Sequence, residues 1–592
     1  MSVSKLMKRT HMCGNLNVNN SGEIVVLNGW VQKRRNLGGL LFITLRDRTG
    51  IVQLNVDPNQ LTDKSSEVDS IRSEYVISVK GLVQKRPDGQ VNEHMKTGDI
   101  EIIVNDLSVL NNAETPPFYI KDDVNAEESL RLKYRYLDLR RPELQKSLMM
   151  RHKIAKSIRD YLDNNQFMEI ETPILTKSTP EGARDYLVPS RVNKGTFYAL
   201  PQSPQIFKQL LMVGGYDRYF QIARCFRDED LRADRQPEFT QVDIEMSFVD
   251  EQDVRAMAEG MVKRVFKDVL NIDLPEQSFP IMSYETAMNK YGSDKPDTRF
   301  DLEITDIESV FNNSEFKVFS TTLKNGGVIK SITVPQTKFS RKQYDNYTKY
   351  VKKYGAMGLI WVAYNEDGIK SSISKFLTDT EIADLAKQAN AKVGDIVFII
   401  AADYNTVSKS LGALRLKLAE DLELIDQAKW EFLWVVDFPL FEYDDEAKRY
   451  VASHHPFTMP KDEDVDLLVS SPGEARAKAY DMVLNGVEIG GGSIRIFNQD
   501  VQKKMFSALG FSEQDAEEKF GFFIEALKYG TPPHGGIAFG LDRLVMEMLH
   551  LTNIRDVIAF PKTTSASSLM SGAPGFVDSK QLEELYIKKL EK

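Results

Sequence analysis

The sequence predicts a multidomain chain: an all-β barrel at the N-terminus, a larger α+β part, and a second α+β module inserted into that part. Short strands separated by glycine-containing turns occupy residues 1–110 and predict the barrel. Residues 226–248 read as two strands joined by a charged loop, which is typical of an antiparallel sheet. Residues 286–424 alternate strands and helices and interrupt a series of polar motifs that resumes after them.

The composition is that of a soluble globular protein. Of the 592 residues, 42% are hydrophobic and 27% charged. No apolar run is long enough to cross a bilayer, and the first residues contain no signal-like apolar stretch, so we expect a cytoplasmic protein with no membrane partner. Cys13 and Cys225 lie far apart with no CxxC spacing, which argues against a disulfide framework and against structural zinc.

Charge is distributed unevenly along the chain. The formal net charge is −10, which argues against a whole-surface nucleic-acid binder. Residues 1–50 hold eight Lys or Arg and two acids, a net of +6 that leaves −16 for the rest. A basic N-terminal module on an acidic body indicates a local contact with a polyanion, although clustering by chance in a short window is the alternative.

An OB-fold is the natural candidate for the barrel of residues 1–110. Alternation in 41–48 predicts two faces, with Leu41, Ile43 and Leu45 inward and Phe42, Thr44, Arg46 and Arg48 outward. On the next strand Gln53 also points outward. An exposed ring beside basic and amide groups is typical of single-stranded nucleic-acid binding, whereas the alternative places Phe42 in a second small core.

The remaining boundaries follow from changes in pattern. We expect a hinge at 111–140, the first part of the α+β body at 141–285, the inserted module at 286–424, the second part of the body at 425–560, and a C-terminal extension at 561–592. Residues 141–170 form an amphipathic pattern, and FMEIETPIL follows as a strand with Pro173 at an edge or an end. The inserted module contains no catalytic constellation.

The most informative segment is the strand at 239–248. One face carries Val242, Ile244, Met246 and Phe248, and the other carries Phe239, Gln241, Asp243 and Glu245. Before the loop, Cys225, Arg227 and Glu229 share a face by the same period. The first set packs on a core. The second forms a polar floor that suits a ligand carrying both charge signs.

Two nearby motifs supply further ligand-binding candidates. In QSPQIFKQLLM, Ser203 suits a helix N-cap and Pro204 the first helical position, so Gln205, Lys208 and Gln209 share one face. That face forms a carboxylate-binding corner or, alternatively, a solvated surface. In TPEGARDYLV (179–188), Glu181 and Asp185 flank Gly182, which suggests a lid or an amine-binding loop.

The segment YDMVLNGVEIGGGSIRI predicts a hairpin with a two-residue turn at Asn485–Gly486. Val483 then faces Glu488, and Asp481 lies diagonal to Glu488 on the same face. Two close carboxylates repel unless a cation lies between them, so we expect Mg²⁺ there rather than a solvated acidic face. Strict alternation would put Arg495 on the opposite face unless residues 490–492 contain a bulge.

Two shorter motifs complete the series. The pair His454–His455 has no further ligand at metal spacing, so a hydrogen-bonding role in a pocket is favoured. In GIAFGLDRLVMEML a strand breaks at Gly540 into a helix whose first turn contains Arg543. The helix dipole disfavours a cation there, so we expect a bound anion. The sequence lacks both GxxxxGK[ST] and a GxGxxG between strand and helix, so bound ATP would not be held by either of those folds.

Together these segments resemble the three class II aminoacyl-tRNA synthetase motifs: ETPIL with Pro173, FRDE with Arg227, and GLDR with Arg543. TPEGARDY, QSPQIFKQ and HHPFT resemble the aspartyl variety of the bacterial type, and the likeness covers nearly the whole chain. The resemblance implies a six-stranded antiparallel catalytic sheet flanked by helices and a homodimer formed through the motif 1 region. It also makes the barrel an OB-fold anticodon-binding domain and the insertion a GAD domain.

The resemblance also assigns roles to matching residues. L-aspartate is bound by Glu181, Gln205, Lys208, Arg227, Asp243, His454 and Arg495. ATP is bound by Arg227, Asp228, Glu229, Gln236, Phe239, Glu488, Gly540, Leu541, Asp542 and Arg543, with Mg²⁺ on Asp481 and Glu488. The catalytic residues are Arg227, Glu488 and Arg543. In the barrel, the anticodon is read by Arg35, Phe42 and Gln53, and Leu37 matches members that discriminate between tRNAs.

The activity implied is that of an aspartate–tRNA ligase, which makes aspartyl-adenylate and pyrophosphate and then charges the 3′ end of tRNA-Asp. The close alternative is a relaxed enzyme that also charges tRNA-Asn. An asparaginyl enzyme is disfavoured because Lys208 and Arg495 would be left as unpaired buried cations. A non-catalytic paralogue conflicts with the presence of Arg227, Glu488 and Arg543, and a free-standing amino-acid ligase would have no use for a basic barrel.

Overall fold

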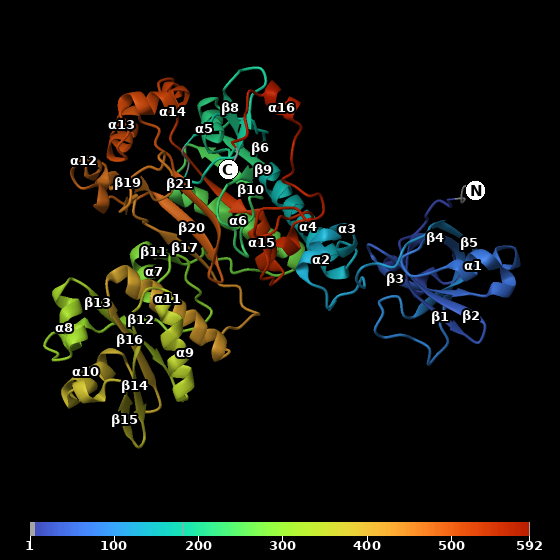
Figure 1. Cartoon of the computed structure of the whole chain (residues 1–592), viewed down its shortest axis with the longest axis horizontal. Helices are drawn as coiled ribbons and strands as arrows, with labels where there is room; N and C mark the ends of the chain where they lie inside the picture. Colours follow the sequence, from blue (N-terminus) through green and yellow to red (C-terminus); the bar gives the residue numbers. More distant parts are fainter. Residues whose placement is uncertain (1–5, 180–181, 591–592) are drawn as a thin grey trace. The chain divides into compact units, whose positions relative to one another are not determined.

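The structure is a computed structural model that describes residues 6–179 and 182–590. The chain forms two compact units (Figure 1). The first comprises Met1–His152, Leu231–Gln236 and Leu549–Val577, and the second comprises Lys153–Asp230, Pro237–Met548 and Asp578–Lys592. No helix among the described residues is both long and apolar enough to cross a membrane.

The first unit contains the predicted barrel. Its strands close in the order β1-β2-β3-β5-β4, with β1 at Ile24–Leu37, β2 at Leu40–Asp47, β3 at Gly50–Val56, β4 at Val76–Lys85 and β5 at Ile100–Asn111. Helix α1 (Ser65–Ser70) lies between β3 and β4 in the chain. The inward residues Leu41, Ile43 and Leu45 are fully buried, as the alternation predicts.

Arg46 departs from the predicted outward set because it is buried. Its Nη2 lies 2.9 and 2.8 Å from the two carboxylate oxygens of Glu74, and Arg140 Nη1 lies 2.9 Å from the same carboxylate. Arg46 and Glu74 are each about 5% exposed. The segment before β4 therefore covers this end of the outward face, and the charge is tolerated there because it is paired and hydrogen-bonded.

The other part of the first unit joins the predicted hinge to the C-terminal extension. It contains α2 (Glu128–Lys133), α3 (Arg135–Asp138) and the start of α4 (Pro142–Asn164). The guanidinium of Arg135 donates hydrogen bonds to the carbonyl oxygens of Arg555, Ile558 and Ala559. These bonds satisfy backbone acceptors in a segment that has no regular strand or α-helix.

The second unit is built on an eight-stranded sheet of order β11-β17-β20-β21-β22-β10-β9-β6. The strands are β6 Met168–Glu169, β9 Arg218–Phe226, β10 Glu238–Ser247, β11 Ile281–Ser283, β17 Phe432–Val436, β20 Ala479–Leu484, β21 Val487–Ile494 and β22 His534–Gly540. The inner six strands are antiparallel, and β11 and β6 are parallel to their neighbours. The predicted six-stranded antiparallel sheet is thus confirmed, with a short parallel strand added at each edge.

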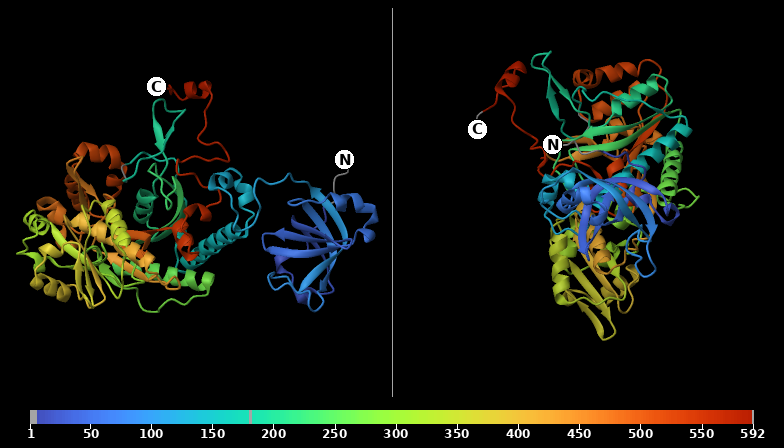
Figure 2. Two further views of the ribbon diagram at one scale, coloured as in Figure 1. Left: turned by 60° about the horizontal axis from the view of Figure 1, so that its bottom comes forward. Right: turned by 90° about the vertical axis from the view of Figure 1, so that its right-hand side faces the viewer.

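Besides this sheet, the second unit contains helices and two small hairpins. The helices are α5 Gln205–Val213, α6 Glu251–Leu270, α7 Tyr284–Tyr291, α12 Leu467–Ser470, α13 Gln499–Ala508, α14 Glu513–Ala526, α15 Leu541–Met548 and α16 Ser579–Glu584. The hairpins are β7 Leu187–Pro189 with β8 Phe197–Ala199, and β18 Phe441–Asp444 with β19 Arg449–Ala452. In both views of Figure 2 the β7–β8 hairpin stands out from the sheet.

Three local predictions need correction. Pro204, with ψ at 25°, occupies the N-cap position of α5, so Ser203 lies one residue too early to cap it. Phe248 does not join the apolar face of β10, because the strand ends at Ser247 and Phe248 has φ of 58° and is 73% exposed. In FMEIETPIL only Met168 and Glu169 pair as a strand, which therefore ends before Pro173.

Between β11 and β17 the chain builds a separate five-stranded sheet of order β12-β13-β16-β14-β15 (Figure 1). Its strands are β12 Ile304–Asp306, β13 Val328–Val334, β14 Ile360–Asn365, β15 Gly368–Ser371 and β16 Ile396–Ala402, and its helices are α8 Lys317–Lys324, α9 Arg341–Lys352, α10 Asp379–Gln388 and α11 Tyr404–Asp421. Two hydrophobic clusters complete this module. Helix α7 runs across position 286, and the boundaries and the GAD identity stay predictions.

Glu547 provides a pH test of the second unit. It lies on α15, and burial raises the pKa of its carboxyl to about 7 from 4.5, although Arg299 and Arg543 oppose the rise. The folded state therefore holds the proton more tightly than the unfolded state, so stability falls as pH rises from about 4.5 to 7. We expect Glu547→Gln to raise the melting temperature more at pH 8 than at pH 5, with a difference in unfolding free energy between the two pH values of at most about 3 kcal/mol.

Scanning calorimetry at the two pH values measures this difference. Glu518→Gln on the exposed surface of α14 is the matched control and should give the same small change at both. Equal effects of Glu547→Gln at pH 5 and pH 8 would show that its carboxyl titrates normally.

Candidate active site

A cavity of about 400 Å³ opens on the polar face of the eight-stranded sheet. It is lined by side chains from α5 and from β10, β20, β21 and β22, together with the segments that follow β9, β11 and β17. The predicted residues that it brings together are Gln205, Lys208, Arg227, Asp243, His454, Asp481, Glu488 and Arg495. Three clusters of side chains, each with at least one member that lines the cavity or contacts a residue that does, determine its chemistry.

The sheet register explains why the cavity is open. Asp481 pairs with Gly491, Gly491 with Ala538, and Ala538 with Asp243, so one row crosses four strands. Residues paired in this way point to the same face. Two small residues therefore separate two carboxylates. A Cβ on Gly491 would lie 2.7 Å from Asp481 Oδ1, so glycine is required for that carboxylate to lie over the sheet.

The first cluster is a buried group of two cations and two carboxylates. Lys208 Nζ lies 3.1 Å from Asp243 Oδ1 and 3.6 Å from Glu245 Oε2. Arg495 holds Glu245 with both arms of its guanidinium, Nε to Oε1 at 2.9 Å and Nη2 to Oε2 at 3.2 Å. All four side chains are at most 2% exposed. Such charges are tolerated in an interior only when they are paired and hydrogen-bonded.

Asp243 keeps one unused acceptor. Its Oδ2 is buried and has no hydrogen-bond partner. Burial raises the pKa of Asp243, although Lys208 opposes the rise. Burial also opposes ionisation of Glu245, but Arg495 and Lys208 hold the pKa of that carboxyl below its ordinary value. The buried Oδ2 of Asp243 could therefore accept hydrogen bonds from a ligand cation. Beside it, the ammonium of Lys208 and the guanidinium of Arg495 suit a ligand carboxylate.

Both histidines of the HHPF motif line the cavity. His455 Nε2 lies 2.8 Å from Arg495 Nη1, and because arginine can only donate, this nitrogen accepts. Burial and the Arg495 charge hold the pKa of His455 well below its ordinary value, and the same causes lower the pKa of His454 to about 4. Both rings are therefore neutral at pH 7, which agrees with the pocket role predicted for the pair.

The second cluster is the carboxylate pair of the β20–β21 hairpin. Val483 pairs with Glu488 and Leu484 with Val487, as predicted from the Asn485–Gly486 turn. The register then shifts, and Ile489 is the extra residue. This bulge brings Glu488 and Arg495 to one face, as required, but it lies one residue before the predicted position. Burial raises the pKa of Asp481 well above its ordinary value, and the Glu488 charge adds to the rise.

The third cluster contains the two arginines of the synthetase-like motifs. The guanidinium carbon of Arg227 lies 5.1 Å from the centre of the Phe239 ring, and its Nε is buried without a hydrogen-bond partner. Arg543 Nη1 donates to the carbonyl oxygen of Glu488 at 3.0 Å and lies 4.0 Å from Glu488 Oε2. Arg543 thus reaches the carboxylate hairpin from the first turn of α15.

Other residues predicted for ATP do not line the cavity: Asp228, Glu229, Gln236, Phe239, Gly540, Leu541, Asp542 and Arg543. Asp542 Oδ2 accepts from the Thr240 backbone N–H at 2.8 Å and so fastens α15 to β10. Gln236 belongs to the first unit, where its side-chain amide pairs with both backbone groups of Lys562. Glu181 lies outside the described residues. The ATP roles stay predictions.

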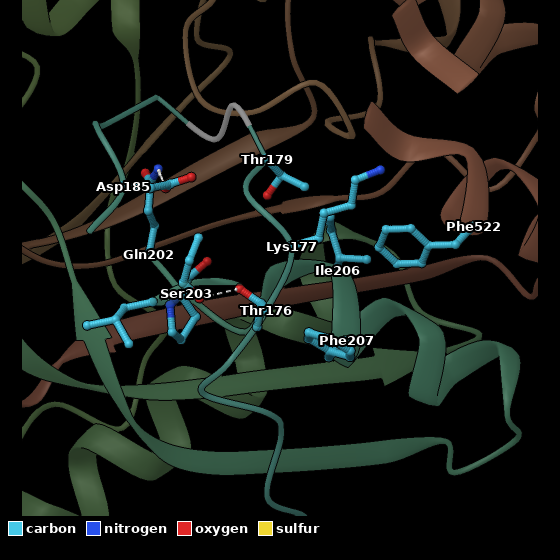
Figure 3. A pocket seen from close by; sticks show the side chains of 12 residues that line it. Thr176, Lys177, Thr179, Asp185, Gln202, Ser203, Ile206, Phe207 and Phe522 are labelled. Atoms are coloured by element: carbon cyan, nitrogen blue, oxygen red, sulfur yellow. Dashed lines mark hydrogen bonds between the residues drawn. The ribbon is translucent and has the colours of Figure 1, made fainter. Parts of the chain in front are cut away.

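A smaller cavity lies beside α5, and Asp185 of the predicted lid loop lines it together with Gln202 (Figure 3). Gln202 Nε2 donates to Asp185 Oδ1 at 2.6 Å and to the Ala183 carbonyl at 2.7 Å, and its Oε1 accepts from Ala183 N–H at 3.0 Å. Arg184 forms an antiparallel bridge with Asp228, and its Nε lies 2.7 Å from Asp228 Oδ2. Asp228 and Asp185 therefore position this loop.

Sequence reasoning missed several contributors. Glu245 holds Arg495, although its place on the polar face beside Asp243 could have indicated a role in the site. His455, rather than His454, contacts Arg495. Ser493 Oγ lies 2.6 Å from Arg495 Nη1, and Tyr284 and Asp294 reach the cavity from the segment that leads into the inserted module. No sequence periodicity connects residues so far apart.

The barrel forms a separate candidate site on β1, β2 and β3. Arg35 pairs directly with Phe42, and Thr44 pairs with Gln53. Gln53 Nε2 donates to Glu101 at 3.1 Å. Leu37 is 61% exposed beside the two glycines that turn β1 into β2. Arg35, Phe42 and Gln53 thus occupy one outer face, with Leu37 at its tip.

Comparison with known proteins identifies the family of the chain and the fold of its barrel. The family model described as tRNA synthetases class II (D, K and N) matches residues 127–564, and that of the OB-fold nucleic acid binding domain matches 25–110. An Aspartate--tRNA(Asp/Asn) ligase from Bacillus cytotoxicus is 56% identical over 585 residues, which are 98% of this chain and 99% of the relative. A ligase of the same name from Bacillus anthracis gives the same figures.

Solved structures show the same fold. Asparaginyl-tRNA synthetase from Pyrococcus horikoshii, complexed with asparaginyl-adenylate, has a TM-score of 0.59 at 18% identity and covers 94% of this chain and 99% of its own. Aspartyl tRNA synthetase from Entamoeba histolytica has a TM-score of 0.58 at 19% identity, with coverages of 94% and 91%. With the family matches and the close relatives, the chain belongs to the class II aminoacyl-tRNA synthetases, among the aspartyl-tRNA synthetases of the bacterial type.

Proposed function

We propose that this enzyme activates L-aspartate with ATP and Mg²⁺ to aspartyl-adenylate and then transfers the aspartyl group to the 3′ end of tRNA-Asp. The observation that carries the proposal is the buried cluster of Lys208, Asp243, Glu245 and Arg495. Lys208 and Arg495 suit the side-chain carboxylate of aspartate. The free Oδ2 of Asp243 suits its α-ammonium.

The same cluster supports selection against asparagine. A neutral amide would present an NH₂ donor or a weaker acceptor to two cations that can only donate. Glu245 and Ser493 fix the Arg495 guanidinium before substrate arrives, so little ordering is needed on binding. Gln205, on the same face of α5 as Lys208, adds an amide beside the amino-acid site.

The chemistry needs positioning and charge stabilisation rather than a base, because the α-carboxylate of aspartate is already ionised at neutral pH. That carboxylate attacks the α-phosphorus of ATP, and the bond to pyrophosphate breaks. Arg227 stabilises the charge that develops on the α-phosphate. Arg543 binds the terminal phosphate and holds the leaving pyrophosphate. Glu181 is proposed to bind the α-ammonium group of the amino acid, and Asp228 and Glu229 to bind ATP.

The carboxylate pair Asp481–Glu488 fits Mg²⁺. Burial and mutual repulsion favour protonation of Asp481, and a cation would reverse that preference. No cluster of three or more metal-ligating side chains occurs in residues 6–179 and 182–590, so the triphosphate would complete the coordination. When bound, the ion neutralises phosphate charge.

The outer barrel face of Arg35, Phe42 and Gln53 is proposed to read the anticodon by stacking and hydrogen bonding. A homodimer is proposed through the motif 1 region (Met168, Ile174, Leu175) and the β7–β8 hairpin (Leu187, Phe197), whose named residues are each about half exposed. The two segments are joined by the bridge between Thr176 and Ala199, and exposed apolar residues on adjoining segments favour a partner surface.

A second candidate function is charging of tRNA-Asn as well. The names of the Bacillus relatives, at 56% identity, favour it, whereas Leu37 favours discrimination. Transcripts of tRNA-Asp and tRNA-Asn, tested separately, decide between the two.

The first prediction concerns the aspartate pocket. Arg495→Leu should lower kcat/KM for aspartate in ATP–pyrophosphate exchange by about 10²-fold or more, because the substrate carboxylate loses one partner of a buried, hydrogen-bonded charge pair, which costs about 2–5 kcal/mol of binding. The double variant Glu245→Gln/Arg495→Leu keeps the cluster neutral and should fold, yet remain inactive on aspartate. Arg264→Leu, at an exposed pair with Asp268, is the control. Unchanged aspartate kinetics in Arg495→Leu would refute the pocket assignment.

The second prediction concerns the metal. Glu488→Gln and Asp481→Asn should each raise the Mg²⁺ concentration that gives half-maximal exchange, because each removes one anionic ligand. The KM for aspartate at saturating Mg²⁺ should change much less. A metal dependence identical to the unmodified enzyme would remove the hairpin as the metal site.

The third prediction concerns the barrel. Phe42→Ala should lower kcat/KM for tRNA-Asp by about 5- to 150-fold, the range expected for losing one base stack of about 1–3 kcal/mol. Aspartate-dependent exchange, which does not involve tRNA, should be unaffected. Ser66→Ala, at an exposed position of α1, is the control. Equal loss of both activities would instead indicate a folding defect.

A further inference from the structure

We propose that Arg299 and Asn485 are positioning residues that fix the carboxylate hairpin, and that through them the inserted module sets the metal affinity of the active site. The proposal rests on the function proposed above, since it concerns the same hairpin. Arg299 lies on the segment that enters the inserted module, and Asn485 begins the hairpin turn.

The turn is held first by the segment entering the module. Asp297 is 4% exposed, and its Cβ would lie 2.9 Å from a Cβ on Gly486, whose φ is 85°. Arg299 fixes Asp297 through Nη2 to Oδ2 at 2.7 Å and Nε to Oδ1 at 3.0 Å. A third contact runs from Arg299 Nη2 to the Asn485 carbonyl oxygen at 3.5 Å. The paired guanidinium and carboxylate therefore form a wall against which the turn packs.

The segment leaving the module holds the same turn from its other side. Asn485 Oδ1 accepts from the Glu431 backbone N–H at 2.9 Å, and Asn485 Nδ2 donates to the Lys429 carbonyl at 3.1 Å. Its own backbone N–H donates to the Glu431 carbonyl at 3.0 Å. Arg299 Nη1 also lies 3.4 Å from Gln427 Oε1, so the two segments are joined. Asn485 is 7% exposed, so these bonds are shielded from water.

Helix α11 of the module contacts the segment that leads into the module at two points. Arg415, 1% exposed, donates to the carbonyl oxygens of Phe300 at 2.9 Å and Leu302 at 3.0 Å, directly after Arg299. Before it, Gly292 and Gly412 meet so closely that a Cβ on Gly412 would lie 2.7 Å from the Gly292 carbonyl. A buried arginine and a glycine crossing leave α11 little freedom to move without this segment.

A continuous set of contacts therefore leads from α11 through Arg299 and Asp297 to the turn. Glu488 is two residues after the turn glycine, and Asp481 lies four residues before Asn485. A shift of the turn changes the separation of the two carboxylates. Mg²⁺ demands near-ideal ligand geometry, and groups that orient metal ligands typically change affinity by 10–100-fold when they are removed.

The test uses the full-length enzyme and the variants Arg299→Lys and Asn485→Asp, with Arg264→Lys at the exposed Arg264–Asp268 pair as control. We expect each test variant to raise the Mg²⁺ concentration for half-maximal pyrophosphate exchange by about 10-fold. The KM for aspartate at saturating Mg²⁺ should stay unchanged, because Lys208 and Arg495 do not contact the turn. The control should match the unmodified enzyme.

A second measurement is independent of turnover. Mn²⁺ binding, followed by electron paramagnetic resonance in the presence of a non-hydrolysable ATP analogue, should weaken by a similar factor in both test variants. Arg415→Lys, which acts from α11, should weaken it in the same direction by less.

The outcomes separate the two proposals. A lower melting temperature or kcat with unchanged metal dependence in Arg299→Lys and Asn485→Asp would give these residues a purely structural role and overturn the inference. Unchanged metal dependence in Glu488→Gln would overturn the metal assignment itself. If Arg299→Lys fails to fold, Asn485→Asp, which keeps the acceptor for Glu431 and places a carboxylate oxygen where the amide donated to Lys429, decides alone.

Discussion

The pairing of two buried cations with two buried carboxylates constrains the rest of the catalytic unit. Lys208, Asp243, Glu245 and Arg495 come from a helix, a central strand and the end of a third element, so the cluster forms only when the sheet register is correct. Any slip of β10 by one residue would send Asp243 and Glu245 to the apolar face and leave both cations unpaired. Because an unpaired buried charge is costly, the chain folds stably only with the strand register that also builds the pocket.

Glycines make that pairing sterically possible. A Cβ on Gly536 would lie 2.1 Å from Glu245 Oε2, and one on Gly491 would overlap Asp481. The floor between Asp481 and Asp243 is therefore formed by Gly491 and Ala538, which leaves room for an amino acid and phosphates to approach the sheet closely. The bulge at Ile489 completes the arrangement, since without it Glu488 and Arg495 would face opposite sides.

Much of this could be predicted from sequence where a local period carries the information. The polar face of β10, the Asn485–Gly486 turn and the face of α5 follow from periods of two or 3.6 residues. Glu245 was visible on its face, but its partner Arg495 is 250 residues away, and the position of the bulge depends on how β21 pairs with β20. Arg46 was misplaced for the same reason, because the segment with Glu74 that buries it lies beyond the reach of strand alternation.

Amino-acid selection, tRNA contact and metal binding are assigned to three different parts of the chain. Under the proposed function, selection of the amino acid would depend on buried ion pairs, which salt screens weakly, whereas contacts to tRNA from exposed Arg35 on the barrel would depend on ionic strength. The carboxylate hairpin depends instead on the two segments that bracket the inserted module, because they hold its turn. If the inserted module contacted only the surface, its sequence could change, or the module could be lost, without affecting the reaction. The segments before and after this module both hold the hairpin turn, so their sequence is constrained by the geometry that Asp481 and Glu488 need.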